Sequence, residues 1–169
     1  MNNIEYMDKL KNRLKSYFDI YENKMFSDIN FDIYAEYNER SSSYLFTQKA
    51  EIYAFETHEY ILYKELDKPL DKLELEKYKN LVSNNIKNIV KLNEEHMSSI
   101  ITLVFSCLEN PDSEIIKGIR KFHYYKSFSF GFRGWVNVKL YYVNPLTKDI
   151  YFNKYGRRGK GNFLFTEEQ

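Results

Sequence analysis

The last third of the chain combines basic and aromatic side chains, which together suit the binding of an anion such as nucleic acid. Residues 120–165 contain ten Lys or Arg and a single acid, Asp149, with 14 of the chain's 30 aromatic residues. Residues 1–119 hold fifteen bases and twenty-one acids, so the whole chain has a formal net charge of only +1. Rings can stack on unpaired bases while Lys and Arg neutralise phosphates. The sequence therefore indicates an anion-binding surface near the C-terminal end.

The strand expected over residues 123–132 has two faces, and they support two interpretations. Phe128, Phe130 and Phe132 share one face and are expected to be buried, because Phe prefers the protein interior. Nucleic-acid binding would use the opposite face, the return strand after a turn at 133–134, and the basic residues that follow. The candidate contacts to an anion or nucleic acid are Arg133, Trp135, Lys139, Arg157, Arg158, Lys160 and Tyr125.

Residues 156–161, Gly-Arg-Arg-Gly-Lys-Gly, are a second candidate for phosphate contacts. Glycine lets backbone N–H groups approach an anion closely. The segment lacks the strand–loop–helix spacing of a P-loop, and its composition is also typical of a solvated basic loop. The sequence therefore predicts one domain over residues 1–155, followed by a basic glycine-containing tail over residues 156–169.

A charged cluster in the acidic part of the chain is the remaining place where chemistry is conceivable. Glu56 and His58 lie two residues apart and share a face of an extended strand, with Glu51 and Glu59 nearby. One carboxylate and one imidazole supply two ligands, whereas a catalytic zinc ion takes three from the protein. A charged surface turn explains the cluster. The sequence predicts no catalytic residue, no metal ligands and no cofactor.

Hydrophobic periodicity predicts the elements that position these residues. Apolar residues at three- and four-residue spacing predict helices over 4–21 and 71–91. The residues Asn110-Pro-Asp-Ser-Glu114 predict the start of a short third helix, with Asn110 as its cap, that ends near Lys121. Strands are expected over residues 31–37, 44–55, 59–66, 98–105, 123–132, 135–142 and 150–155, with a polar turn at 39–43. The order α-β-β-β-α-β-α-β-β-β indicates a single-domain α+β protein. Its sheet is expected to be mainly antiparallel, with about three helices.

The first six of these elements, over roughly residues 4–106, are similar in order to the core of the PD-(D/E)XK nucleases. The resemblance implies a metal-dependent hydrolase of nuclease-like topology. That chemistry needs a Glu-x-Lys sequence on the third strand, and residues 59–66 contain none.

Composition favours a protein of a reducing compartment. The single cysteine, Cys107, cannot form an intrachain disulfide and is expected to be a small buried side chain. The longest apolar stretch falls well short of the roughly 18 residues that a membrane span needs, and the N-terminus lacks a signal-peptide pattern. Richness in Lys, Asn, Ile and Tyr favours an AT-rich bacterial genome. We expect a bacterial, cytoplasmic protein without a membrane partner.

Three functions stay open on this basis. The first is a non-enzymatic interaction or ligand-binding domain, whose partner is a second copy of the chain or another protein. The second is single-stranded nucleic-acid binding through the C-terminal third, and the third is the metal-dependent hydrolase. Exposure of the C-terminal rings would favour nucleic-acid binding, whereas three polar side chains converging in a cleft would favour an enzyme.

Overall fold

The computed structural model describes residues 1–44, 51–90 and 93–165. Three α-helices, seven strands and two 3-10 segments follow one another along these residues. Their order is α1 (Asn3–Leu14), β1 (Asp19–Phe26), β2 (Ile29–Tyr44), β3 (Glu51–Glu65), α2 (Lys72–Ile89), β4 (His96–Ser106), α3 (Ser113–Lys121), β5 (Tyr125–Ser127), η1 (Ser129–Gly131), β6 (Trp135–Asn144), β7 (Asp149–Phe152) and η2 (Lys154–Asn162).

The seven strands form one mixed sheet in the order β1-β2-β3-β4-β6-β5, with β7 also paired to β6. The first three strands are an antiparallel meander, and β5 and β7 run antiparallel to β6. In the middle, β3, β4 and β6 are parallel neighbours. Parallel pairing arises because α2 and α3 each return the chain to the starting end of the sheet. The protein is therefore a single α+β domain, as predicted, but its sheet is mixed.

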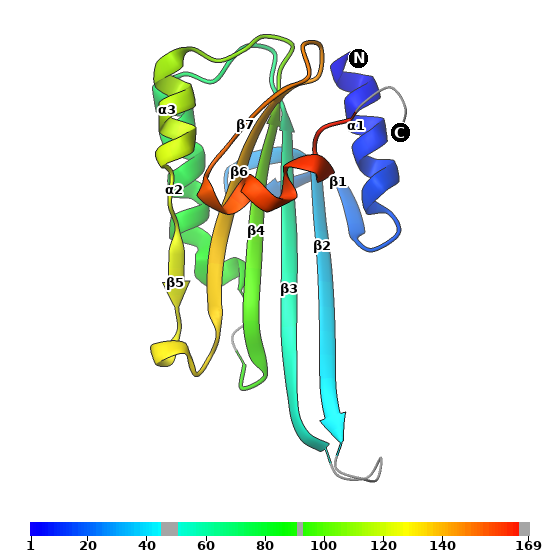
Figure 1. The fold of residues 1–169 in the computed structure, drawn as a ribbon, viewed down its shortest axis with the longest axis vertical. Helices are drawn as coiled ribbons and strands as arrows, with labels where there is room; N and C mark the ends of the chain where they lie inside the picture. The colour runs from blue at the N-terminus through cyan, green and yellow to red at the C-terminus, as the bar shows by residue number, and fades with distance from the viewer. Residues whose placement is uncertain (45–50, 91–92, 166–169) are drawn as a thin grey trace.

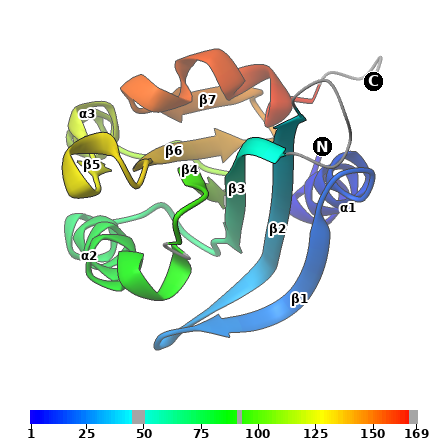
Figure 2. The same ribbon diagram turned by 90° about the horizontal axis from the view of Figure 1, so that it is seen from below.

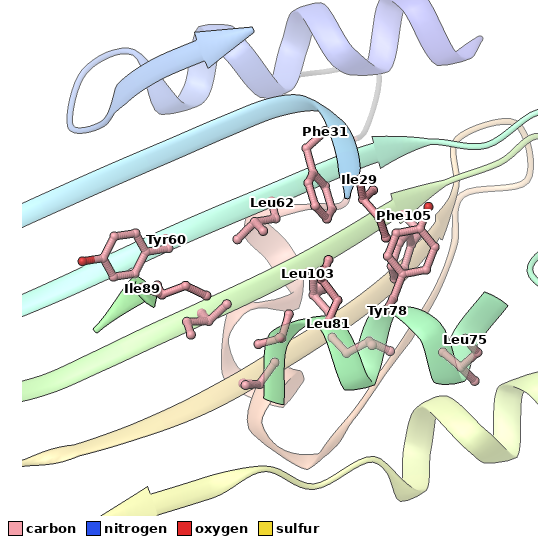
Figure 3. Close-up of a cluster of buried hydrophobic side chains, with 14 of the residues drawn as sticks. Ile29, Phe31, Tyr60, Leu62, Leu75, Tyr78, Leu81, Ile89, Leu103 and Phe105 are labelled. Carbon is pink, nitrogen blue, oxygen red and sulfur yellow. The ribbon is translucent and has the colours of Figure 1, made fainter. Parts of the chain in front are cut away.

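The sheet separates two hydrophobic layers (Figures 1 and 2). On one face, α2 and α3 cover the strands, and Figure 3 shows Tyr78 of α2 against Phe105 and Leu103 of β4. On the other face, α1 and η2 cover the strands, with Tyr6 of α1 and Tyr141 of β6 in the core. Cys107, at the end of β4, is buried as expected.

On the second face, α1 and η2 cover only one end of the sheet, and β2, β3, β4 and β6 continue beyond both (Figure 1). The side chains on this continuation are half-buried. Strand pairing places Ile100 between Glu59 and Asn137. We call this region the open face; it consists of Thr57, Glu59, Ile100, Asn137 and Trp135.

Side-chain caps fix the starts of α2 and α3, the first at the predicted position and the second two residues after the predicted cap, Asn110. The side chain of Asp71 accepts a hydrogen bond from the Glu74 backbone N–H, and the Glu74 carboxylate accepts one from Asp71 N–H, which is a capping box. Asp112 accepts from the N–H groups of Glu114 and Ile115 at the start of α3. The predicted central strand at 98–105 is also confirmed as β4.

The first helix and the meander differ from prediction in their boundaries. Helix α1 ends at Leu14, and the chain from Asp19 forms β1 against β2, with Ile20 opposite Ala35. The turn predicted at 39–43 lies inside β2, which pairs with β3 along this length. Polar residues do not end the strand there, because it runs past the helices and its side chains need not be buried.

Candidate nucleic-acid interface

Aromatic rings line the β5–β6 edge of the open face. Tyr125 pairs with Asn137, and Ser127 with Trp135, so Tyr125 and Trp135 lie diagonally on one face. Their rings are 6.2 Å apart and inclined by 25°, which is a stacked arrangement. Tyr125 is 51% exposed and Trp135 is half-buried. Both predicted stacking residues are therefore together and accessible.

A second ring pair continues this line towards η2. The Tyr155 hydroxyl lies 2.6 Å from Nε2 of His123, and the two ring centroids are 4.9 Å apart. Desolvation, and to a lesser degree the Tyr125 hydroxyl, raise the pKa of Tyr155. The two pairs are thus neighbours, and we call His123, Tyr155, Tyr125 and Trp135 the aromatic row.

Exposed cations of η2 lie beside Tyr155, at one end of the aromatic row. Lys154, Tyr155, Arg157 and Arg158 of η2 line a surface hollow of about 510 Å³. An adjoining hollow of about 370 Å³ is lined by Arg120 together with residues of β7 and η2. Ion pairs to described residues are absent for Arg120, Lys121, Lys126, Arg133, Lys139, Lys154, Arg157, Arg158 and Lys160. Their charge is therefore available to an anion.

The other predicted contacts are spread more widely. Lys139 lies on the same face as Trp135 but inside a cavity of about 250 Å³ between α1 and η2, with Glu59 and Thr102. Lys160 lies over the ring of Phe152 in β7. Arg133 is exposed in the loop before Trp135. Of the predicted contacts, Tyr125 and Trp135 therefore belong to the aromatic row, and Arg157 and Arg158 of η2 lie beside it. Lys139, Lys160 and Arg133 lie at the margins of the row.

A buried asparagine that sequence reasoning missed holds η2 in place. Asn153 Oδ1 accepts from the N–H groups of Leu140 and Gly156, at 3.1 Å each. Its Nδ2 donates to the carbonyls of Val138 (2.8 Å) and Phe122 (3.3 Å). One amide thereby ties β6, the end of α3 and η2 together. Its residue type, a favoured N-cap three residues before the glycine-rich segment 156–161, is a signal that could have found it.

The glycines of η2 allow close packing, and the segment is not a tail over its described length. A Cβ atom on Gly156 would lie 3.0 Å from the ring of Tyr141, and one on Gly159 would lie 2.7 Å from its hydroxyl oxygen. The Tyr141 hydroxyl donates to the Gly156 carbonyl at 2.8 Å. Beyond η2, Phe163 and Phe165 are buried. Residues 166–169 of the predicted tail lie outside the described residues.

The prediction that three phenylalanines share a buried face was wrong for two of them. Phe128 is buried, but Phe130 and Phe132 are 101% and 88% exposed. Strand β5 ends at Ser127, and the η1 turn follows. The turn breaks the alternation of a strand, so the two later rings no longer face the core.

The charged cluster around His58 lies within β3 and is not a surface turn, which corrects the sequence prediction. His58 is buried, with Nδ1 2.6 Å from Asn38 Oδ1 and Nε2 3.5 Å from Glu56 Oε2. Its ring is stacked on His96, with centroids 5.9 Å apart. Across the described residues, no group of three His, Cys, Asp or Glu side chains is placed to hold a metal ion.

Fold and site together define a single-domain α+β protein with a basic, aromatic sheet edge. The family model described as "Domain of unknown function (DUF8052)" matches residues 2–165, so the chain belongs to this family. No curated protein and no solved structure matches the chain. In the described part of the chain, every helix is too short or too polar to cross a membrane.

Proposed function

We propose that this protein is a non-enzymatic domain that binds single-stranded nucleic acid along the aromatic row and η2. The observation that carries the proposal is the stacked, accessible Tyr125–Trp135 pair, near exposed cations of η2 that form no ion pair with any described residue. Single-strand binders combine the same two parts, since rings stack on bases of any sequence and cations follow the backbone.

The charge distribution across the sheet supports one location for the strand. Glu59 on the open face, and Glu39, which pairs with Thr57 at its border, repel phosphates. The β5–β6 side is instead bordered by Arg157 and Arg158. An anionic backbone is therefore attracted to the β6 edge and to η2. The rings there lie on a sheet surface, where unpaired bases can reach them and stacked duplex bases cannot.

Asn137 gives this surface a polar contact among the rings. It lies on the open face between Trp135 and Lys139 in β6, opposite Tyr125. Its Oδ1 atom is buried and has no hydrogen-bond partner among the described residues. A buried acceptor without a partner is costly, and the edge of a stacked base offers N–H donors. We therefore propose that the Asn137 amide turns outward when a base stacks beside it and then accepts a hydrogen bond from the edge of that base.

The hydrolase alternative has less support from the side chains near the open face. The cavity between α1 and η2 places Glu59, Thr102 and Lys139 together, and Glu59 is the one carboxylate among the described residues that line it. Metal-assisted hydrolysis of a phosphodiester is typically built on several converging ligands. We therefore infer binding without cleavage.

The fluorescence of Trp135, the only tryptophan, tests the proposal. Titration with single-stranded oligothymidylate or oligouridylate should quench and shift its emission, because a base stacks on the indole. Trp135→Ala should weaken binding by about 1–3 kcal/mol, whereas Trp135→Phe should retain most of the affinity, measured by anisotropy of a labelled oligonucleotide. The proposed site would be contradicted if neither oligonucleotide changed the intensity or wavelength of the Trp135 emission and if Trp135→Ala kept the wild-type affinity.

A further inference from the structure

We propose that the η1 loop, residues 128–134, is a second base-stacking position that extends the aromatic row. This inference rests on the proposed function and names a further part of the same binding site. The loop presents Phe130 and Phe132 almost completely to solvent. It begins directly beyond the last pair of the β5–β6 ladder, Ser127 with Trp135, so it continues the line of rings.

The backbone of the loop is strained in a way that points the rings outward. Ser129 and Phe130 have φ angles of 48° and 55°, in the left-handed region that residues with a Cβ atom disfavour. Internal hydrogen bonds hold this conformation, from Phe128 N–H to the Gly134 carbonyl (2.9 Å) and from Phe132 N–H to the Ser129 carbonyl (3.0 Å). Strained residues held this firmly are concentrated at functional sites.

The base of the loop is fixed to β4. Phe128 is buried and meets the ring of His96 edge-on at 6.0 Å. His96 Nδ1 donates to the Arg133 carbonyl at 2.6 Å. Gly134 has a φ of 74°, and a Cβ atom there would lie 2.2 Å from the Met97 carbonyl oxygen, so only glycine fits. A loop anchored in this way loses little conformational entropy when its rings bind a partner.

Charge identifies the partner as a continuation of the same strand. Lys126 and Arg133 flank the two rings, are exposed, and form no ion pair with a described residue. Asp149, the one acid of residues 120–165, is bonded to Asn110 and Thr147 instead. Positive flanks repel a second copy of the same loop but attract the phosphates of a strand that leaves Trp135.

Oligonucleotide length separates the two stacking positions. We would measure affinity for oligothymidylates of about 4 and about 12 nucleotides, within the range of single-strand site sizes. The shorter strand should need only the aromatic row, and the longer one should also reach the loop. Phe130→Ala/Phe132→Ala should weaken binding of the longer strand by about 5- to 150-fold per lost stack and leave the shorter strand unaffected.

Two variants serve as controls. Phe130→Tyr/Phe132→Tyr keeps both rings and should bind as the wild type does. Leu73→Ala/Leu146→Ala removes two exposed apolar side chains elsewhere and should change neither affinity. Thermal midpoints should be unchanged throughout, because the altered side chains are exposed.

The outcomes distinguish this inference from the proposed function. If both strands bind the wild type equally, or if Phe130→Ala/Phe132→Ala keeps the gain with length, the loop is not a stacking position although the aromatic row is. If sedimentation shows that this variant loses self-association with unchanged affinity for DNA, the loop is a contact between copies and the inference is wrong. If neither strand binds the wild type, the proposed function itself fails.

Discussion

Two neighbouring rows of side chains in the central sheet, one on each face, show how differently the two faces are covered. Leu62, Leu103 and Leu140 pair side by side across β3, β4 and β6, and all three are fully buried under α2 and α3. One residue earlier on each strand, the row on the other face reads Ile61, Thr102 and Lys139. The same backbone therefore presents an apolar row to the helices and a mixed row to the cavity between α1 and η2.

The difference between these rows follows from what covers them. Helices α2 and α3 exclude water from their face, so a polar side chain there would lose its hydrogen bonds to water. On the other face α1 and η2 cover only one end (Figure 1), and the polar and aromatic residues beyond them are half-buried and keep part of their surface in solvent. The α2–α3 face is thus covered along the sheet, whereas the open face is left accessible, and the proposed binding site lies there.

Alkaline pH should unfold the protein, and the two faces of the sheet should lose their structure together. Burial, and secondarily Glu36, raise the pKa of Tyr60 on the α2–α3 face to about 12, and burial likewise raises the pKa of Tyr63 and Tyr141 on the α1 face. Because the folded-state pKa lies above the unfolded value, the stabilisation is complete below about pH 10 and is lost as pH rises towards 12 and beyond. Far-ultraviolet circular dichroism and tyrosinate absorbance should change together. Tyrosines that all ionise near pH 10 in an intact fold would refute this.

Truncating one large ring on each face should give very different losses of stability. Phe105 is fully buried, with its ring 4.6 Å from Tyr78, and Phe105→Ala should lower the free energy of unfolding by about 3–5 kcal/mol. Trp135→Ala should cost about 1 kcal/mol or less, because Trp135 is half-buried on the open face. Urea denaturation measures both. Equal losses would mean that Trp135 is a core residue and that the two faces do not differ as described.

Removing the amide of Asn153 should affect both stability and binding. Asn153→Ala leaves buried backbone groups of β6 and η2 without partners, so the free energy of unfolding should fall by about 2–3 kcal/mol. Oligonucleotide affinity should fall as well, since Arg157 and Arg158 lose their support. Asn88→Ala, at an exposed position of α2, is the matched control. A stable Asn153→Ala variant with wild-type affinity would show that η2 is held by its other contacts alone.

The smallest effect is expected from the exposed arginines of η2. Arg157→Ala/Arg158→Ala should leave stability within about 0.5 kcal/mol of the wild type. The slope of log affinity against log salt should become shallower by about 1.4, since each phosphate neutralised on a single strand contributes about 0.7. Lys87→Ala/Lys117→Ala removes the same charge from α2 and α3 and should keep the wild-type slope. Equal slopes in the two variants would mean that the basic edge has no special role.

The sequence alone predicted several features that depend on residues close together in the chain. The helix start predicted at residue 71 was confirmed, because the N-cap Asp71 bonds to a backbone N–H only three residues away. The cap predicted at Asn110 was wrong by two residues, since Asp112 caps α3. The apolar run at 98–105 predicted a central strand, and the surplus of bases after residue 119 predicted the basic edge. The sequence also named Tyr125 and Trp135 as rings that could stack on a base; the structure stacks them on each other, and their role in binding stays a prediction.

Tertiary structure decided the features that depend on distant neighbours. The aromatic spacing of residues 17–21 suits a helix, but β1 forms because β2 offers a pairing partner. Parallel pairing of β3, β4 and β6 depends on where α2 and α3 return the chain. Residues 156–161 read as a mobile basic loop, yet Asn153 and Tyr141 hold them against the sheet. Whether an aromatic side chain is buried or exposed depends on which elements pack over its face of the sheet. The alternation of residues along a strand predicts which side chains share a face, but not whether a helix covers that face.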